Sequence, residues 1–266
     1  MALLSFGMDS RGHGESAGDV NYEHRGAGYA VQRRTDPRIE ALVHGALGDA
    51  RTIVNVGAGA GSYEPEGRHV IAIEPSRAMR AQRPAHRSPA IDGVAEKLPL
   101  DDASVDAAMA MITVHQWSDV RRGLTELRRV ARGPVVILTF DPDALERFWL
   151  ADYVPELVAA ERRRFPSIET IRSSLGGTIR VTVVPVPIDC VDGFTEAYYA
   201  RPERFLEPTV RRSQSAWGFV APDAVDRGIA ELTADLDSGR WERRYGEWRD
   251  KPTFEGSLRL VVAEGA

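Results

Sequence analysis

The chain has 266 residues, of which 43% are hydrophobic and 27% charged, the composition of one large globular domain or of one domain carrying an insertion. Its net charge of −5 shows no excess of basic residues, which argues against nucleic acid or an anionic membrane as a partner. The one cysteine, Cys190, excludes an intrachain disulfide and a multi-cysteine metal site, and no apolar run approaches the roughly 18 residues of a membrane span.

The N-terminal part of the chain divides into a region without periodicity and a helix. Residues 1–20 are rich in glycine and serine, which predicts a mobile start. From residue 22 to residue 47 the pattern becomes helical, with Asp36 placed as the N-cap and Pro37 as the first helical residue. This helix leads directly into the first strand.

Two apolar runs, residues 52–56 and 69–74, predict neighbouring buried strands. The first ends in Gly57-Ala58-Gly59-Ala60-Gly61, and the second ends in Glu74. Glycines let the backbone approach a ligand closely, and an acid at the tip of the next strand can accept hydrogen bonds from both hydroxyls of a ribose. The pattern therefore predicts a site for an adenosine-containing cofactor.

The segments that follow keep alternating between helix and strand. They are a helix at 76–82, a short strand near 89–92, a strand at 105–112, a helix at 118–131 and a strand at 134–140. In the longer helix, Val120, Leu124, Leu127 and Val130 recur at helical spacing and form one apolar stripe. Such alternation predicts a doubly wound parallel sheet, a Rossmann-like α/β fold.

The glycine loop distinguishes between two classes of cofactor. A dinucleotide fingerprint needs glycine at position 62, where this chain has Ser62, and its third glycine comes one residue early. The stretch GVAEKLPLDDASVD at 93–106 and the triplet His115-Gln116-Trp117 then follow in order. Together these signals, over roughly residues 50–140, resemble class I S-adenosylmethionine (SAM) methyltransferases, in the small-molecule group that includes the ubiquinone and menaquinone biosynthesis enzymes.

The resemblance implies a seven-stranded, mostly parallel sheet of order 3-2-1-4-5-7-6 and a SAM site. The residues it assigns to SAM are Gly57, Ala58, Gly59, Glu74, Pro75, Ala95, Glu96 and Thr113, with Tyr29 and Arg33 in the segment that covers the methionine end. His115 follows the strand that ends beneath the sulfonium, so it is a candidate general base. A structural histidine fits that position equally well, and Gln116 or Trp117 could orient the substrate instead.

The chain departs from the usual pattern of the family at three positions. Asn55 stands where many relatives have an acid that orients the loop, so hydrogen-bonding capacity is kept and the charge is lost. Val94 stands where many have Asp, and Pro65 predicts a short or irregular helix after the first strand. These features leave open a SAM-fold protein with a non-methylating role, either a cyclase or a cofactor-binding subunit.

After residue 140 the sequence becomes rich in aromatic side chains. We expect a sixth strand at 178–186, a helical cap insertion at approximately 190–221, a helix at 222–238 and a last strand at 258–262. Trp149, Tyr153 and Tyr198, together with Gln116 and Trp117, are the candidate substrate-binding residues, although aromatic residues also fill cores. Residues 1–35 are assigned to a mobile N-terminal segment and cofactor cover, and 36–266 to a single domain.

The preferred interpretation is a SAM-dependent methyltransferase for a small organic metabolite in bacterial specialised metabolism. The heavy use of Ala, Arg, Gly and Asp suggests a GC-rich bacterial source, and we expect a cytoplasmic monomer or homodimer. The histidines lack ligand spacing, so no metal is expected. An NAD-dependent oxidoreductase is disfavoured by Ser62 and by the absence of a Tyr-x-x-x-Lys set.

Overall fold

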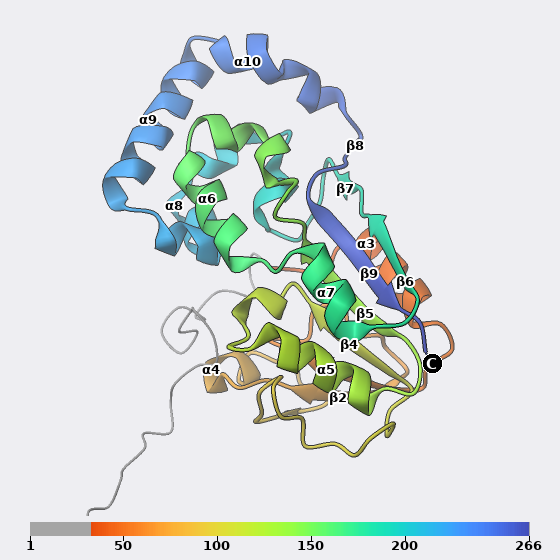
Figure 1. Ribbon diagram of the computed structural model, residues 1–266. Helices are drawn as coiled ribbons and strands as arrows, with labels where there is room; N and C mark the ends of the chain where they lie inside the picture. The colour runs from red at the N-terminus through yellow and green to blue at the C-terminus, as the bar shows by residue number, and fades with distance from the viewer. Residues whose placement is uncertain (1–32, 266) are drawn as a thin grey trace, which may run out of the picture.

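The computed structural model describes residues 33–265, and its centre is a seven-stranded sheet (Figure 1). The strands lie in the order β3-β2-β1-β4-β5-β9-β6. Their bounds are β1 Thr52–Val56, β2 His69–Ile73, β3 Ala90–Ile91, β4 Ala107–Met111, β5 Val135–Phe140, β6 Ile179–Val183 and β9 Leu258–Ala263. When the seven strands of this sheet alone are numbered in chain order, β9 becomes the seventh strand and the order is 3-2-1-4-5-7-6, which confirms the predicted topology.

Pairing within the sheet is parallel except around β9. Strand β1 runs parallel to both β2 and β4, whereas β9 is antiparallel to both β5 and β6. Every residue of β5 is buried, because helices cover both faces of the sheet at this strand. Val135 and Ile137 belong to one core cluster, and Val136 and Leu138 belong to the other.

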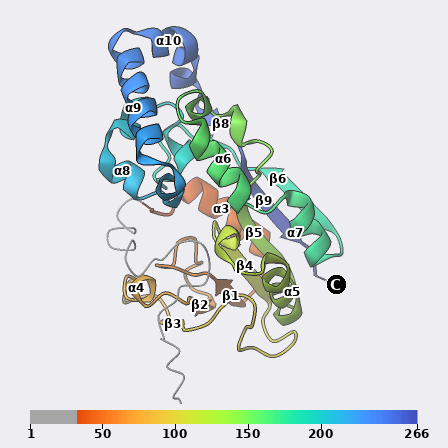
Figure 2. The same cartoon turned by 60° about the vertical axis from the view of Figure 1, so that its left-hand side comes forward.

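Helices α5 (Val120–Val130) and α7 (Ile168–Leu175) cover one face, and α3 (Pro37–Leu47) covers the other (Figures 1 and 2). Leu124, Leu127 and Val130 are the fully buried positions of the apolar stripe predicted for α5. The helix α3 begins at Pro37, with the Asp36 carboxylate accepting a hydrogen bond from the Arg38 N–H, as predicted. Residues 22–32 of the predicted helix lie outside the described part of the chain.

The connection from β1 to β2 contains turns and no helix, within the described residues 57–68. Pro65 and the left-handed backbone of Gly61 (φ 95°), Tyr63 (φ 64°) and Gly67 (φ 75°) are incompatible with a regular helix there. The next helix, α4, is a single turn at Arg77–Arg80, shorter than the predicted 76–82. The chain after β1 therefore forms turns, and Tyr63 and Glu64 of these turns are buried.

A lobe of helices lies at the carboxyl ends of the strands (Figures 1 and 2). Its helices come from two parts of the chain: one part follows β5, and the other lies between the short strands β7 (Val186–Pro187) and β8 (Thr253–Phe254). The lobe contains α6 Pro155–Arg164, α8 Pro208–Arg212, α9 Pro222–Asp237 and α10 Arg240–Tyr245, with the 3-10 turns Leu145–Arg147, Trp149–Asp152, Thr195–Tyr198, Pro202–Leu206, Ser215–Phe219 and Gly246–Asp250. The predicted cap at 190–221 falls within this lobe. No helix in the described region is long and apolar enough to cross a membrane.

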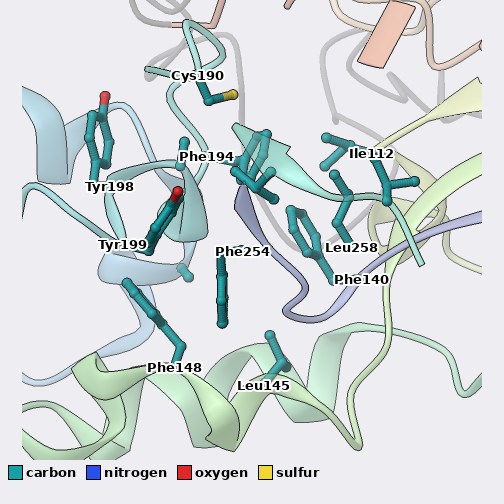
Figure 3. Close-up of a cluster of buried hydrophobic side chains, with 14 of the residues drawn as sticks. Ile112, Phe140, Leu145, Phe148, Cys190, Phe194, Tyr198, Tyr199, Phe254 and Leu258 are labelled. Atoms are coloured by element: carbon teal, nitrogen blue, oxygen red, sulfur yellow. The ribbon is translucent and has the colours of Figure 1, made fainter. Parts of the chain in front are cut away.

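Aromatic side chains hold the lobe together and fix it on the sheet (Figure 3). Phe140, at the end of β5, packs edge-on against Phe194 with a ring separation of 5.4 Å. Deeper in the lobe, Phe148 lies 6.1 Å from Phe254. Such pairs each add about 0.5–1.5 kcal/mol beyond the burial of their area, so the lobe has a well-packed core of its own, continuous with one face of the sheet.

Candidate functional site

Two adjoining hollows lie where the carboxyl ends of the strands meet the lobe. The first, with about 590 Å³ of empty space including its open mouth, is lined by Arg33, Asn55, Gly57, Ala58, Gly59, Ala60, Ser62, Tyr63, Glu74, Met79, Met111, Ile112, Thr113 and Gln116. The second, with about 500 Å³, is lined by Arg33, Ile112, His115, Gln116, Phe140, Leu145, Glu161, Arg164, Phe165, Phe194, Thr195, Glu196, Gln214 and Ser215. Arg33, Ile112 and Gln116 line both hollows, so the two hollows adjoin at these residues.

Glu74 is the acid of the first hollow. Its Oε2 accepts a hydrogen bond of 2.8 Å from the Gly59 N–H, and its Oε1 accepts one of 2.9 Å from the Ser76 N–H. Burial raises the pKa of this carboxyl, while the two N–H groups act in the opposite direction. Each carboxylate oxygen can accept a second hydrogen bond, so Glu74 has the capacity to bind both hydroxyls of a ribose.

Gly57 sits where the glycine loop meets the end of β4. Its backbone is left-handed, with φ of 68°, and a Cβ at this position would collide with the side chain of Thr113. No other residue type fits both the conformation and the space. The loop therefore lies directly against Thr113, which lines the same hollow.

A buried acid that the sequence analysis missed stands behind Asn55. Glu64, 1% exposed, accepts a 2.9 Å hydrogen bond from the Asn55 side-chain amide and one of 2.8 Å from Arg83. Asn55 stands where the resemblance predicts an acid, and in this structure the carboxylate of Glu64 lies next to it. Its Oδ1 is buried and lacks a hydrogen-bond partner within the described structure, and Asn55 lines the first hollow. An acceptor in such a position suits a ligand ammonium group.

The glycine loop is tied to the lobe through Asp192. The Tyr63 hydroxyl donates to Asp192 Oδ2 at 2.8 Å, and the Arg33 Nε–H donates to Asp192 Oδ1 at 2.6 Å. Asp192 is 1% exposed, so both bonds are shielded from water. Burial raises the pKa of Tyr63 well above its ordinary value, which keeps the phenol as the donor. The first hollow and the lobe therefore share one buried hydrogen-bond cluster.

His115 lines the second hollow and is held by its neighbours. Its ring lies 4.3 Å from the Phe165 ring, and its Nε2 lies 3.3 Å from the side-chain nitrogen of Gln116. Burial lowers the pKa of His115 well below its ordinary value, and the charges of Arg164 and Arg33 add to this effect. The imidazole is therefore neutral at physiological pH. Its role as a base stays a prediction.

Two glutamates that the sequence analysis missed also line the second hollow. Both oxygens of Glu196 accept the Ser257 N–H at 3.0 Å, and Oε1 also accepts the Ser257 hydroxyl at 2.8 Å. Glu161, on α6, is half-buried and contacts the Thr195 hydroxyl. Burial is the main cause that raises the pKa of each carboxyl to about 7. The hollow thus combines apolar rings with groups that titrate near neutrality.

The comparisons with known proteins agree with this geometry. The family described as a methyltransferase domain matches residues 54–138. A solved structure from Anabaena variabilis, described as a methyltransferase from an antibiotic biosynthesis pathway, is 32% identical with a TM-score of 0.81, and the match covers 87% of this chain and 98% of that one. The chain belongs to the methyltransferase family. SAM is accordingly its cofactor.

Other relatives of this methyltransferase match a smaller part of the chain or share only its fold. An uncharacterized methyltransferase of Mycobacterium tuberculosis is 37% identical over 91 residues, which are 31% of this chain and 36% of that relative. The match thus spans about a third of the curated relative. A SAM-dependent methyltransferase from Thermotoga maritima, 17% identical over 92% of this chain and 98% of its own, has the same fold with a TM-score of 0.55.

The chemistry of the first hollow of this methyltransferase fits SAM. Glu74 supplies acceptors for the ribose, the glycine loop leaves its backbone accessible, and the orphaned Oδ1 of Asn55 supplies an acceptor for the ammonium of the methionine end. Of the residues predicted for the cofactor, those that line this hollow are Arg33, Gly57, Ala58, Gly59, Glu74 and Thr113. Tyr29 lies outside the described residues.

Three other predicted cofactor residues of the methyltransferase do not line either hollow. Pro75 follows Glu74 and is half-buried. Ala95 is 4% exposed and belongs to the core under α5. The Glu96 carboxylate accepts the Ser118 hydroxyl at 2.8 Å and the Asp119 N–H at 3.0 Å, which fixes the start of α5. Met79, which was not predicted, lines the hollow near Gly59.

The predicted substrate residues of the methyltransferase also divide into two groups. Gln116 lines both hollows, whereas Trp117 packs against Gly123 of α5. The structure places Trp149, Tyr153 and Tyr198 in the core of the lobe, outside both hollows, which differs from the expectation. Their polar atoms have internal partners where they are buried: the Trp149 Nε1–H donates to the Tyr199 carbonyl and the Tyr153 hydroxyl donates to Asp235, both at 2.8 Å.

Ile112 forms the wall between the two hollows of the methyltransferase. It follows β4 directly and has φ of 51°, a left-handed backbone that a β-branched residue adopts only under strain, at a cost of order 1–3 kcal/mol. Its N–H donates to the Leu138 carbonyl at 2.7 Å, which holds this conformation in place. The chain thus turns sharply where the two hollows meet.

Proposed function

We propose that this protein transfers the methyl group of SAM to a small organic acceptor bound in the second hollow. The observation that carries the proposal is the shared wall: Arg33, Ile112 and Gln116 line the hollow that contains Glu74 and also the hollow under the lobe. A ligand in one hollow is therefore next to a ligand in the other. Methyl transfer needs this arrangement, because the nucleophile has to approach the methyl in line with its bond to sulfur.

When bound, SAM supplies a methyl group activated by its positive sulfur. The residues of the chain supply alignment and exclusion of water, and alignment alone can contribute about 7–11 kcal/mol. Glu74 fixes the ribose, Asn55 receives the ammonium, and Gln116 lies between donor and acceptor. His115 remains the predicted base, with its neutral ring on the acceptor side of the wall.

A small acceptor and a role in bacterial specialised metabolism form the finer part of the proposal. The rings of Phe140, Phe165 and Phe194 line the second hollow, which favours a small organic molecule with an apolar part. The similar protein from Anabaena variabilis is described as part of an antibiotic biosynthesis pathway. That description supports specialised metabolism without naming an acceptor.

Calorimetry tests the cofactor, and a metabolite screen tests the reaction. S-adenosylhomocysteine (SAH) should bind and NAD should not. Glu74→Ala should weaken SAH binding by about 1–3 kcal/mol, because it removes charged hydrogen bonds, whereas Glu96→Ala, outside the hollow, should leave it unchanged. Incubation of small-metabolite pools with SAM should then yield a product heavier by one methylene. NAD binding in preference to SAH would overturn the cofactor assignment; SAH binding without any methylated product would favour the non-methylating alternative.

A further inference from the structure

Glu64 is a buried carboxylate in the turns after β1, and its two oxygens have different partners. Its Oε2 accepts a hydrogen bond of 2.8 Å from Arg83, and the side chains of Arg83 and Glu64 are only 3% and 2% exposed. Arg87 donates to the Glu64 carbonyl at 2.8 Å and lies 3.7 Å from Oε2. Oε1 accepts the Asn55 side-chain amide at 2.9 Å. One carboxylate oxygen thus faces the guanidinium groups, and the other faces Asn55.

The ion cluster of Glu64, Arg83 and Arg87 packs directly against the glycine loop. Gly61 has φ of 95°, and a Cβ there would come within 2.6 Å of Arg87 Cδ and 3.1 Å of Glu64 Oε2. The Arg83 guanidinium also donates to the Gly59 carbonyl at 3.4 Å. Because Gly59 lines the first hollow, the ion cluster supports the wall of the cofactor site.

The ion cluster decides how the Asn55 side chain is turned. A side-chain amide has one donor end and one acceptor end, and a carboxylate paired with guanidinium groups can only accept. The nitrogen end of Asn55 therefore faces Glu64, because the reverse orientation would set two oxygens 2.9 Å apart with no proton between them. The oxygen end, Oδ1, is left buried without a hydrogen-bond partner among residues 33–265, on a side chain that lines the first hollow.

We propose that Glu64 is a positioning residue for SAM, which turns Asn55 so that Oδ1 accepts the ammonium of the methionine end. The inference rests on the role given to Asn55 in the proposed function and adds the residue that enforces it. Of the described residues, Glu64 is not among those that line the first hollow, so it acts through Asn55. Two residues thus replace the acid that the resemblance predicts at position 55: an amide that faces the ligand, and a carboxylate nine positions later that orients the amide.

The change Glu64→Gln should reverse this orientation. The buried Arg83 still needs an acceptor, so the oxygen of the new amide stays with Arg83 and its nitrogen faces Asn55. Asn55 then turns over to accept a hydrogen bond from that nitrogen, and its own N–H groups face the hollow. The ligand ammonium loses its acceptor and meets a second donor in a buried site, which is unfavourable.

Calorimetry with two ligands tests this role of Glu64. The first ligand is SAH, and the second is deamino-SAH, in which hydrogen replaces the amino group while the carboxylate is kept. Glu64→Gln should weaken SAH binding about tenfold or more and leave deamino-SAH binding unchanged. Glu66→Gln is the matched control, because Glu66 lies in the same turns but is exposed, and it should change neither affinity. A general distortion of the hollow would weaken both ligands alike.

A second change should restore what the first removes. Asn55→Asp added to Glu64→Gln moves the carboxylate from position 64 to position 55 and keeps the total charge. One oxygen of the moved carboxylate can accept the nitrogen of the new amide, and the other can accept the ligand ammonium. The SAH affinity of the double variant should therefore return close to that of the unmodified protein.

The outcomes separate this inference from the proposed function. Unchanged SAH affinity in Glu64→Gln, an equal loss of both ligands, or a loss of SAH that the double variant does not recover would overturn the role of Glu64. Asn55→Ala, measured with the same two ligands, tests the ammonium assignment itself. A selective loss of SAH in Asn55→Ala with none in Glu64→Gln would remove the inference alone, whereas equal changes for both ligands in Asn55→Ala would remove the assignment as well.

Discussion

The Tyr63 hydroxyl donates a hydrogen bond of 2.8 Å to the carboxylate of Asp192, a residue 129 positions further along the chain. Tyr63 belongs to the glycine loop and lines the cofactor hollow, and Asp192 precedes the 3-10 turn that carries Thr195 and Glu196 into the acceptor hollow. The bond therefore connects the loop of the first hollow to the wall of the second, the hollow proposed for the acceptor.

Tyr63→Phe should weaken SAH binding and destabilise the fold. The change leaves one oxygen of a buried carboxylate without its donor, which costs about 1–3 kcal/mol. Tyr153→Phe is the matched control, because the Tyr153 hydroxyl donates to Asp235 at the same distance of 2.8 Å in the lobe, away from the cofactor hollow. Thermal unfolding should show a loss in both variants, and calorimetry should show a loss of SAH affinity in Tyr63→Phe only. Equal SAH affinity in the two variants would contradict the connection.

Asn55→Ala should weaken the binding of SAH but not that of methylthioadenosine. The orphaned Oδ1 of Asn55 is assigned to the ammonium of the methionine end, which methylthioadenosine lacks. Loss of this acceptor should cost about 1–3 kcal/mol for SAH. Calorimetry with both ligands measures the difference, and any general damage to the hollow would weaken both. Parallel losses for the two ligands would place the ammonium elsewhere.

The free energy of unfolding should depend on pH partly through the titration of Glu196. The pKa of Glu196 is raised from 4.5 to about 7 in the fold, so the folded protein binds more protons than the unfolded chain between these values. The contribution of Glu196 is therefore fully present below pH 4.5 and is lost as the pH rises through about 7. Glu196→Gln cannot titrate, so the difference in unfolding free energy between the variant and the unmodified protein should change steadily over this interval. Urea unfolding at stepped pH measures it; a constant difference would contradict the shift.

Two glycine-to-alanine changes in helices should act in opposite directions. In α9 a Cβ at Gly228 would collide with the carbonyl oxygen of Tyr153, so Gly228→Ala should destabilise the lobe by about 1–3 kcal/mol through overpacking. In α3 nothing lies within 4 Å of a Cβ at Gly45, so Gly45→Ala should stabilise the protein by about 0.5–1 kcal/mol. Denaturant unfolding of both variants tests the pair. Equal signs would show that the packing of α9 against Tyr153 is not as tight as described.

The sheet could be predicted from the sequence because its signals are local. Most strands of the sheet are short runs of mainly apolar residues, and the glycine loop and Glu74 stand directly at strand ends. The apolar stripe of α5 likewise follows from spacing alone. The cofactor hollow was therefore predictable wherever its residues come from the tips of β1, β2 and β4.

The acceptor hollow was not predictable in the same way, because it depends on contacts between distant segments. An aromatic residue that fills a core and one that lines a pocket have the same sequence signature, so Trp149 and Tyr153 could not be separated from Phe165. Glu161 lies in the charged run ERRR, which resembles a solvated helix face. The contact between Glu64 and Asn55 could not be predicted either, because it depends on the turns that follow β1.

Ile112, the residue with a left-handed backbone between the two hollows, limits how this enzyme can be redesigned. Because one side chain borders both hollows, a replacement chosen to admit a bulkier ligand into the second hollow will also reshape the first. A glycine there would relieve the backbone, yet it would remove the side chain that borders both hollows. Acceptor scope is therefore better broadened from the far wall, at Leu145 or Phe194, where the donor compartment is not touched.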